Sequence, residues 1–451
     1  MSWIVYKGFQ PGQFDFGWPV WTLIVLWLCV PILFYFCMAH ATYLWRVRQR
    51  RLAGPLGNDV AMIVLGDLGH SPRMAYHVRS LVRKGRFVHL CGYLESTLPD
   101  FLYDDDTVDL YEIPVIRRRA WMPYLVFAVY KVAAQCFELT RLLSTVIDEN
   151  TEYVLVQNPP SIPVLAIVVI LRKTICPHVK IVVDWHNLNF SILNLKYHNE
   201  NHPAVQLLRN YEKYVGKFAD YHFTVTEKLK EYLQKEFGID GTRISVVHDR
   251  PSDEFVPLEG DRMEVVKELA VLDGFQDADK LIVSATSFTE DEDFGVLVEA
   301  LKKLDSKLDT RVFMVVTGKG PLQKKFLDLV AQNKWSENMI IRNAWLSVSD
   351  YPKLLQVADA GVSLHYSSSG LDLPMKIVDL FGCGIPVVSM NFPALHELVT
   401  YENGLVMENN SDASELCDKI HQLLYGVDLK PGALRESTRR WDQEWQNTRI
   451  F

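Results

Sequence analysis

Short apolar runs alternate with polar loops and amphipathic stretches along most of the chain. Residues 60–65 form a continuous apolar run, residues 74–84 have helical periodicity, and residues 87–91 form the next apolar run. Continuous apolar runs of this length are typical of strands that are covered on both faces, and strands that alternate with helices favour a parallel sheet. The pattern therefore predicts an α/β protein with doubly wound sheets.

The strand and helix pattern falls into two series. The first contains "YVLVQNPPS", "KIVVDWHN" and "YHFTVTEKLKEYLQKEFG"; the second begins near Ile244 with "RISVVHDRPSDEF" and ends with "IPVVSM". We predict two Rossmann-like domains, residues 59–242 and 243–432, that face a cleft, because ligands of open α/β sheets bind outside the carboxyl ends of the strands. The sequence does not decide whether the polar and aromatic tail, residues 433–451, packs back on the first domain.

The N-terminal segment has a different pattern. Residues 18–41 contain no Asp, Glu, Lys or Arg, and a run of this length can span a bilayer as a helix. Residues 1–17 carry one basic residue, whereas residues 42–58 contain the basic collar "RVRQRR" and a turn-rich linker. The positive-inside rule then predicts a single-pass anchor with a lumenal tail and both domains in the cytosol. A cleaved signal peptide is the alternative, but its apolar core would be shorter and nearer a basic N-terminus.

Composition narrows the classes of function. The chain has 451 residues, 49% of them apolar, and a net charge of -8. This length allows two sizeable cores, and without a basic domain a nucleic-acid partner is not expected. The 7 cysteines form no C-x-x-C or Cys/His cluster, so neither a disulfide framework nor a zinc site is indicated. Residues 116–147, in which Arg117 to Arg119 precede an aromatic and aliphatic run, favour equally a core helix and a helix in the membrane interface.

The stretch "SSSGLDLPMKIVDLFGCGIPVVS", residues 367–389, contains the clearest candidate chemistry. Pro374 suits the first turn of a helix and Gly384 suits its C-terminal end, so the preceding loop leads to a helix N-terminus that can bind phosphate. Lys376 adds a positive charge. Asp379, three residues further on the same face, can accept hydrogen bonds from sugar hydroxyls. A surface ion pair between Lys376 and Asp379 would explain the same spacing.

Several motifs together resemble a known enzyme family. "PMKIVDLFGCGIPVV" resembles the donor-binding motif of GT-B glycosyltransferases, in which an acidic residue on this helix holds the nucleotide ribose. With "SFTEDEDF", "VVTGKGPL" and "DWHN", the chain is similar to the chitobiosyldiphosphodolichol β-mannosyltransferases, glycosyltransferase family 33. The resemblance covers the anchor and both domains.

The resemblance implies a GT-B fold and an inverting transfer of mannose from GDP-mannose to GlcNAc2-diphosphodolichol, in β-1,4 linkage. This reaction would be the first mannosylation of the lipid-linked oligosaccharide for N-linked glycosylation, at the cytosolic face of the endoplasmic reticulum membrane. Other glycosyltransferases of the same pathway would be candidate partners. No cofactor or metal is expected to be required, because such enzymes stabilise the leaving diphosphate with amides, a helix dipole and basic side chains. Stimulation by a divalent cation is left open.

The resemblance also implies donor-binding residues, with two departures from the wider GT-B pattern. Where many such enzymes have a glutamate eight residues before the ribose-binding acid, this chain has Leu371, and Asp372 lies one residue later. The loop that often carries Arg and Lys is here acidic, so other groups must bind the diphosphate. The donor-binding candidates are Arg250, Glu290, Gly318, Lys319, Gly320, Ser369, Gly370, Leu371, Asp372, Lys376 and Asp379.

The first domain is expected to bind the acceptor. Gly69 would let the backbone approach a ligand, Arg73 could reach a phosphate of the lipid carrier, and Trp185 is a candidate acceptor contact. Inversion by direct displacement needs a general base near the acceptor hydroxyl, and the candidates are Asp184, His186 and His70. Each of the three could instead have a purely structural role.

Two other functions remain compatible with the sequence. One is a membrane-bound GT-B enzyme with a different donor or acceptor. The other is an inactive GT-B subunit that scaffolds a partner transferase, although the presence of Lys376, Asp379 and "GKGP" argues against it.

Overall fold

The computed structural model describes residues 55–118, 121–448 and 450–451, together with Met38, Ala41, Thr42, Trp45, Arg48 and Gln49. No helix within these residues combines the length and the apolar composition needed to cross a membrane. The expected anchor, residues 18–41, lies outside the described residues except for Met38 and Ala41.

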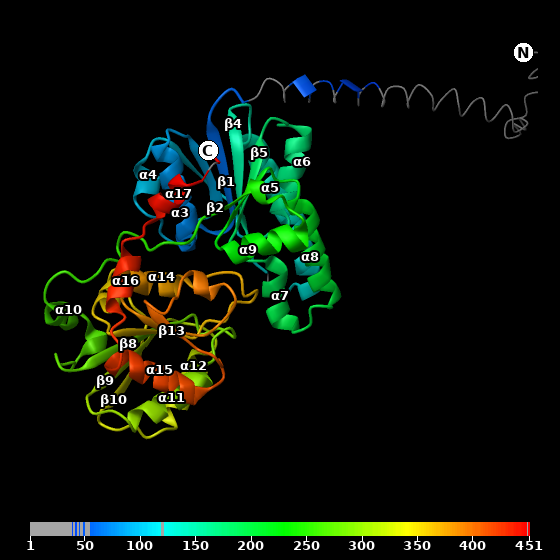
Figure 1. Cartoon of the computed structure of the whole chain (residues 1–451). Helices are drawn as coiled ribbons and strands as arrows, with labels where there is room; N and C mark the ends of the chain where they lie inside the picture. Colours follow the sequence, from blue (N-terminus) through cyan, green and yellow to red (C-terminus); the bar gives the residue numbers. More distant parts are fainter. Residues whose placement is uncertain are drawn as a thin grey trace, which may run out of the picture.

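The first domain is a seven-stranded parallel sheet between two layers of helices (Figure 1). Val60, Met62 and Val64 face one buried core, and Ala61 and Ile63 face the other. Both faces are therefore covered, which explains the continuous apolar run in this strand. The strand order is β3-β2-β1-β4-β5-β6-β7, with β1 (Asp59–Asp67), β2 (Val88–Tyr93), β3 (Val108–Glu112), β4 (Thr151–Asn158), β5 (Lys180–Trp185), β6 (Tyr221–Thr224) and β7 (Ile244–Val246).

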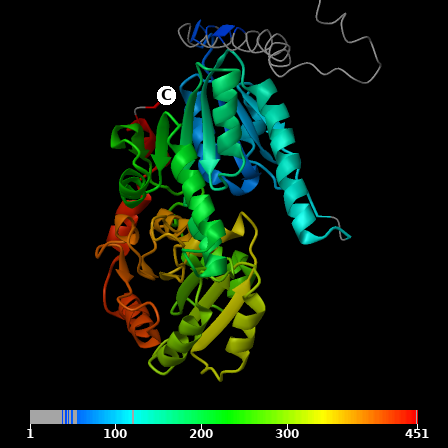
Figure 2. The same ribbon diagram turned by 90° about the vertical axis from the view of Figure 1, so that its right-hand side faces the viewer.

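Helices from distant parts of the chain cover the two faces of this sheet. One layer contains α3 (Pro72–Arg83), α4 (Phe101–Asp104) and α17 (Trp441–Gln446). The other contains α5 (Tyr124–Val146), α6 (Val164–Thr174), α8 (Pro203–Gly216) and α9 (Glu227–Tyr232), with α7 (Asn189–Tyr197) beside α8. Figure 2 shows α5, in cyan, on the outer side of this domain.

The second domain repeats the architecture with a six-stranded parallel sheet, so the prediction of two Rossmann-like domains is confirmed. Its strand order is β10-β9-β8-β11-β12-β13, with β8 (Lys280–Ala285), β9 (Val312–Thr317), β10 (Met339–Ala344), β11 (Ala360–Ser363), β12 (Val387–Ser389) and β13 (Gly404–Val406). One face carries α11 (Phe294–Asp305), α12 (Gln323–Ala331) and α15 (Ala413–Tyr425). The other face carries α10 (Arg262–Glu268), α13 (Asp350–Gln356) and α14 (Met375–Gly382).

The strand at Ile244 belongs to the first sheet, not to the second series as the sequence suggested. β7 pairs in parallel with β6, with His222 opposite Ile244. Val247, directly after β7, is fully buried in the core of the first domain. The domain boundary therefore lies after β7, because the pairing partner of a three-residue strand is a tertiary property that its own pattern does not contain.

The C-terminal segment links the two domains. Helix α16 (Lys430–Ser437) packs beside α14 of the second domain, whereas α17 packs beside α3 of the first (Figure 1). In α17, Trp441 donates from Nε1 to Ser80 Oγ at 3.0 Å. Phe451, the last residue, stacks on Trp445 with ring planes 3° apart. The tail thus closes the core on one face of the first sheet.

Glu397 of the second domain caps a helix of the first. Its carboxylate accepts hydrogen bonds from the backbone N–H groups of Glu227, at 2.7 Å, and Lys228, at 2.9 Å, at the start of α9. It also pairs with His248 Nε2 at 3.0 Å. Burial alone would lower the pKa of His248, but its hydrogen bonds to Glu397 and Glu444 outweigh this effect and raise the pKa to about 9. The contact is therefore an ion pair at neutral pH.

Replacing Glu397 with alanine is expected to lower the free energy of unfolding by about 1–2 kcal/mol at pH 7, because a helix cap and an ion pair are lost together. The raised pKa of His248 means that its contribution is complete below pH 6.5 and is lost as the pH rises through 9. Denaturant unfolding of the purified chain should therefore show a difference that shrinks between pH 7 and 9. Glu402→Ala, which removes an exposed ion pair with Arg435, is the control and should change stability little.

Candidate active site

A cavity of about 290 Å³ lies between the two domains, at the carboxyl ends of the first sheet. This is where open α/β sheets bind their ligands. His70, Arg73, His186 and Asn187 line it from the first domain. Asp372, Leu373 and Met375, at the start of α14, line it from the second. The cavity thus brings candidate acceptor residues and the candidate phosphate-binding helix to the same place.

Asp184 is the centre of a buried polar cluster behind this cavity. Its fully buried carboxylate accepts two hydrogen bonds from Arg73, at 2.9 and 3.0 Å, one from His77 at 3.1 Å and one from His186 at 2.8 Å. Burial alone would raise the pKa of Asp184, but the charged guanidinium of Arg73 and the hydrogen bonds with the two histidines hold the pKa well below its usual range. Asp184 is therefore ionised and saturated with donors, which suits a residue that orients its neighbours.

Arg73 is engaged with protein groups on every side. Besides Asp184, its guanidinium donates to Asp249 Oδ1 and to the carbonyl of Val247, both at 2.8 Å. Burial by itself would lower the pKa of Arg73, but Asp184 and Asp249 raise it above its ordinary value. The expected contact with a lipid phosphate would require these hydrogen bonds to break. The sequence did not indicate this role, because Asp184 is 111 positions away along the chain.

Of the two candidate histidines on the cavity, His186 is the one held in place. Its Nε2 contacts Asp184, and its side chain is 24% exposed. His70 is 79% exposed, and its Nδ1 pairs with Asp67 at 2.7 Å. Gly69, next to it, packs against another loop, since a Cβ there would lie 2.8 Å from the carbonyl of Thr97.

Trp185 does not line the cavity, which corrects its assignment as an acceptor contact. Its side chain is fully buried, and its Nε1 donates to His222 Nδ1 at 3.1 Å. Successive side chains of a strand point to opposite faces, so Trp185 faces away from Asp184. The alternation along β5 was a signal from which this could have been predicted.

The loop before α14 joins the two domains. Asp372 accepts hydrogen bonds from Ser367 Oγ and, across the cleft, from Asn187 Nδ2 at 3.1 Å. The carbonyl of Leu371 accepts from Thr226 Oγ1 of the first domain at 2.5 Å. Ser369 Oγ accepts from the amide of Leu371. Asp372 and Leu371 therefore hold the two domains together, whereas the hydrogen bond of Ser369 lies within the loop.

His365 lies next to Asp372 and was not among the candidate site residues predicted from the sequence. Its Nδ1 pairs with Asp291 Oδ2 at 3.0 Å, and its Nε2 lies 3.9 Å from Asp372. Burial alone would lower the pKa of His365, but the two carboxylates raise it to about 9. A protonated histidine thus compensates the acidic loop locally. A lone histidine after a strand carries no sequence signal for this role.

Lys376 extends from the first turn of α14 to the acidic loop. Its Nζ pairs with Glu292 at 2.7 Å, and the Glu292 side chain is almost fully buried. The amide of Ser287 donates to the other oxygen of the same carboxylate. Glu290, the candidate from this loop, is exposed. The acidic loop thus positions Lys376 at the helix N-terminus.

Asp379 lies one turn further along α14. Tyr351 donates to its Oδ2 at 3.4 Å. Burial raises the pKa of Asp379 to about 7, with a further increase from Glu254. Within the described residues, Asp379 makes no hydrogen bond or ion pair with Lys376, because Lys376 pairs with Glu292 instead. The surface ion pair considered from the spacing is therefore not formed.

The "GKG" glycines allow two loops of the second domain to touch. A Cβ at Gly318 would lie 2.0 Å from the carbonyl of Thr286, and one at Gly320 would lie 1.9 Å from that of Ser287. Gly318 also has a φ of +125°, a region that favours glycine. Lys319 is exposed, with its Nζ 4.8 Å from the centre of the Trp345 ring.

Two other predicted residues contribute to packing. Gly370, with φ +74°, ends its loop against Pro393. Arg250 is buried and donates to Glu444 of α17 at 2.9 Å, so it fastens the C-terminal segment to the interdomain linker. Among the described residues, no group of three or more His, Cys, Asp or Glu is placed to hold a metal ion.

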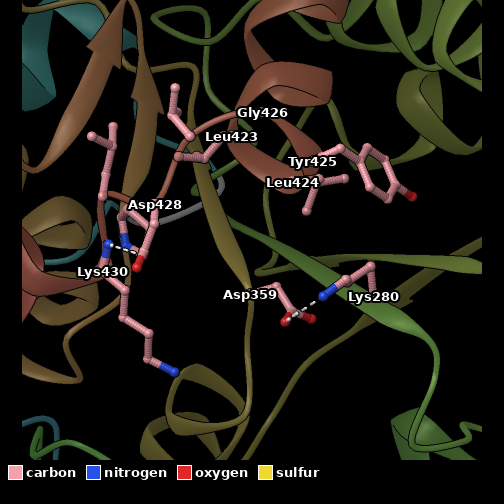
Figure 3. A pocket seen from close by; sticks show the side chains of 11 residues that line it. Lys280, Asp359, Leu423, Leu424, Tyr425, Gly426, Asp428 and Lys430 are labelled. Carbon is pink, nitrogen blue, oxygen red and sulfur yellow. Dashed lines mark hydrogen bonds and ion pairs between the residues drawn. The ribbon is translucent and has the colours of Figure 1, made fainter.

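A second pocket, of about 350 Å³, lies at the amino ends of the central strands of the second sheet; Figure 3 shows its lining. Lys280 and Asp359, at the starts of β8 and β11, line it together with the segment from Leu423 to Lys430. Asp359 already accepts from Arg262 at 2.7 Å and from the amide of Leu281 at 2.8 Å. Because ligands of such sheets bind at the carboxyl ends of the strands, the interdomain cavity is the better candidate site.

Family models and solved structures agree with this fold. Residues 69–249 match a glycosyl transferase 4-like domain, and residues 279–425 match the glycosyl transferases group 1 family. A glycosyltransferase from Rickettsia africae superposes with a TM-score of 0.62 at 16% identity, over 87% of this chain and 100% of that one. WaaG, a glycosyltransferase involved in lipopolysaccharide biosynthesis, gives 0.59 at 13% identity, over 87% and 96%. The chain shares the fold of GT-B glycosyltransferases.

Curated relatives are similar over almost the whole chain. A chitobiosyldiphosphodolichol beta-mannosyltransferase from Debaryomyces hansenii is 44% identical, covering 98% of this chain and 96% of its own. The protein of that name from Candida albicans is 42% identical over 99% and 97%, and the one from Homo sapiens is 36% identical over 90% and 94%. The chain therefore belongs to the chitobiosyldiphosphodolichol beta-mannosyltransferase family.

Proposed function

We propose that this protein transfers mannose from GDP-mannose to GlcNAc2-diphosphodolichol and forms a β-1,4 linkage with inversion. The observation that carries the proposal is the interdomain cavity, where His186, backed by Asp184, faces the N-terminus of α14. Family membership supports the reaction class and the acceptor, and the geometry supplies a base on one wall and an anion site on the other.

The second domain holds the donor. The N-terminus of α14, with Lys376 beside it, binds the diphosphate, because free N–H groups and the helix dipole favour an anion. The amide of Gly320 and the side chain of Lys319 add donors next to the acidic loop, whereas the amide of Gly318 already donates to the carbonyl of Ala344. Asp379 accepts hydrogen bonds from the ribose hydroxyls. Glu292 keeps Lys376 at the helix end.

His186 is the general base. The 4-hydroxyl oxygen of the terminal GlcNAc attacks the anomeric carbon of mannose as the bond from that carbon to the diphosphate breaks. The hydroxyl proton passes to His186 Nδ1, and the negative charge that develops on the diphosphate is stabilised at α14. Asp184, bonded to Nε2, stabilises the imidazolium that forms.

Helix α5 and the residues before it support a contact with the endoplasmic reticulum membrane, where a lipid-linked acceptor would lie. Leu139 and Leu143 of α5 are buried in the core. Phe137 of α5, 67% exposed, and Trp121 before it, 72% exposed, face outward. Arg117 and its neighbours precede the helix. Aromatic side chains with basic residues beside them suit the boundary between headgroups and acyl chains. We place both domains on the cytosolic side, where other transferases of the pathway would be partners.

Donor binding is expected to strengthen as the pH rises through 7. Asp379, with a pKa of about 7, is mostly protonated at pH 6 and mostly ionised at pH 8. Ribose hydroxyls bind the ionised form better, so affinity for GDP-mannose should fall by up to about tenfold from pH 8 to pH 6. Calorimetric titration measures this, and GDP-mannose itself does not titrate in this range. The affinity of Asp379→Asn for GDP-mannose should not change with pH. If the affinity of this variant varied with pH as that of wild type does, Asp379 would not contact the ribose.

A transfer assay tests the proposed function. The purified full-length chain in detergent is incubated with a short-chain GlcNAc2-diphosphate lipid and either GDP-mannose or another nucleotide sugar. We expect a product only with GDP-mannose, with the added mannose released by β-mannosidase and not by α-mannosidase. A product with a different donor would support another GT-B activity. No transfer with any donor would support the inactive scaffold.

A further inference from the structure

A chain of buried hydrogen bonds connects the C-terminal helix to His186. Trp445 Nε1 lies 3.0 Å from His77 Nδ1, His77 Nε2 lies 3.1 Å from Asp184 Oδ2, and His186 Nε2 lies 2.8 Å from the same oxygen. Trp445 is 2% exposed, and His77 and Asp184 are fully buried. His186, at the end of the chain, lines the interdomain cavity.

The chemistry of the groups determines the direction of each hydrogen bond. The indole Nε1–H can only donate, so His77 Nδ1 must accept and its Nε2 must carry the hydrogen that points to Asp184. Burial lowers the pKa of His77, which keeps the ring neutral and in this single tautomer. Its ring is also fixed between Phe223, which stacks on it at 5.2 Å, and the edge of Trp441 at 4.9 Å.

Asp184 therefore has an orientation that the surrounding side chains determine. Arg73, itself bonded to Asp249, supplies two charged donors, and His77 supplies a neutral one. With these positions filled, Asp184 can accept from His186 Nε2–H, which leaves His186 Nδ1 unprotonated. A histidine whose second nitrogen is held by a carboxylate has both its tautomer and its ring orientation fixed.

We infer that Trp445 and His77 are positioning residues that hold Asp184 in place and thereby fix the tautomer and orientation of His186. The inference rests on the proposed role of His186 as base. It assigns the C-terminal helix a role in the reaction although α17 follows the second domain in the sequence. Because α16 lies on the second domain and α17 on the first, the same segment ties the position of the donor domain to this chain of hydrogen bonds.

The test replaces Trp445 with phenylalanine, which keeps an aromatic ring and removes the donor. Trp441→Phe is the matched control, because it removes a hydrogen bond of the same length on the same helix, to Ser80, and keeps an aromatic ring against His77. In the full-length chain, we expect Trp445→Phe to lower kcat for mannosyl transfer by about tenfold. The KM for GDP-mannose should stay within about twofold of wild type, because the donor lies on the other domain.

The pH profile separates positioning from a general loss of stability. Without the indole N–H, His77 is no longer restricted to the tautomer that donates to Asp184, so the Asp184–His186 hydrogen bond is less well fixed and the pH profile of kcat should change in Trp445→Phe and not in Trp441→Phe. If Trp445→Phe does not fold, benzothienylalanine at position 445 keeps the fused ring without an N–H and should give the same result.

Three outcomes are distinguishable. A wild-type chain without transfer activity would overturn the proposed function itself. An active wild type with the lower kcat and the changed pH profile at position 445 alone supports the inference. An active wild type in which both tryptophan variants behave alike overturns it and leaves the proposed function standing.

Discussion

Replacing His186 with alanine is expected to lower kcat for mannosyl transfer by about 10²–10⁴-fold, while GDP-mannose binds with unchanged affinity. The reason is geometric. His186 is the histidine on the cavity whose Nε2 is held by a buried, ionised carboxylate, and its side chain is partly open to the cavity. Initial rates with saturating donor and acceptor measure kcat, and titration calorimetry measures donor affinity.

His70→Ala is the matched control for this prediction. His70 lines the same cavity, but its side chain is 79% exposed and pairs with Asp67 at the rim. We expect His70→Ala to retain most of the activity. If His70→Ala lost transfer and His186→Ala kept it, the assignment of the base would be reversed.

Replacing Asp184 with asparagine is expected to lower the free energy of unfolding by about 3–5 kcal/mol at pH 7, because it leaves the buried Arg73 with an incomplete set of partners. The depressed pKa of Asp184 means that its contribution is present above its ordinary pKa of 3.8 and is lost as the pH falls below that value. Denaturant unfolding at pH 7 and at pH 2 should therefore show a smaller difference between wild type and variant at the lower pH.

Asp253→Asn provides the comparison, since it breaks the ion pair of Asp253 with Arg79, in which the aspartate is 77% exposed. This variant should cost no more than about 1 kcal/mol. Equal losses for the two variants would contradict the central structural role of Asp184.

The architecture followed from the sequence because it depends on local patterns. Apolar runs such as residues 60–65 read as doubly covered strands, and the two sheets are parallel as predicted. The predicted domain boundary before β7 was wrong, because a strand of three residues has no local pattern that selects its pairing partner. The position of the C-terminal tail was left open since it depends on the contacts of Trp441 and Trp445 with α3.

The candidate site was predicted as a set of positions more successfully than as a set of roles. "DWHN" and the residues before α14 do meet at one cavity, since both follow carboxyl ends of parallel strands. What each side chain contacts was not readable. Arg73 and Asp184 are far apart in sequence, and the partner of Lys376 proved to be Glu292 rather than Asp379. Trp185 does not line the cavity, because its side chain is buried on the other face of β5. Only the alternation of side chains along β5 indicated this.

The structure of the chain with GDP bound tests the central claim, that the interdomain cleft is the donor site, most directly. We predict that the diphosphate lies at the N-terminus of α14 within hydrogen-bond distance of Lys376, and that the ribose hydroxyls contact Asp379. The guanosine should lie on the second domain, with the diphosphate facing His186 across the cavity. GDP bound elsewhere, for example in the pocket lined by Lys280 and Asp359, with the cleft empty, would contradict the account.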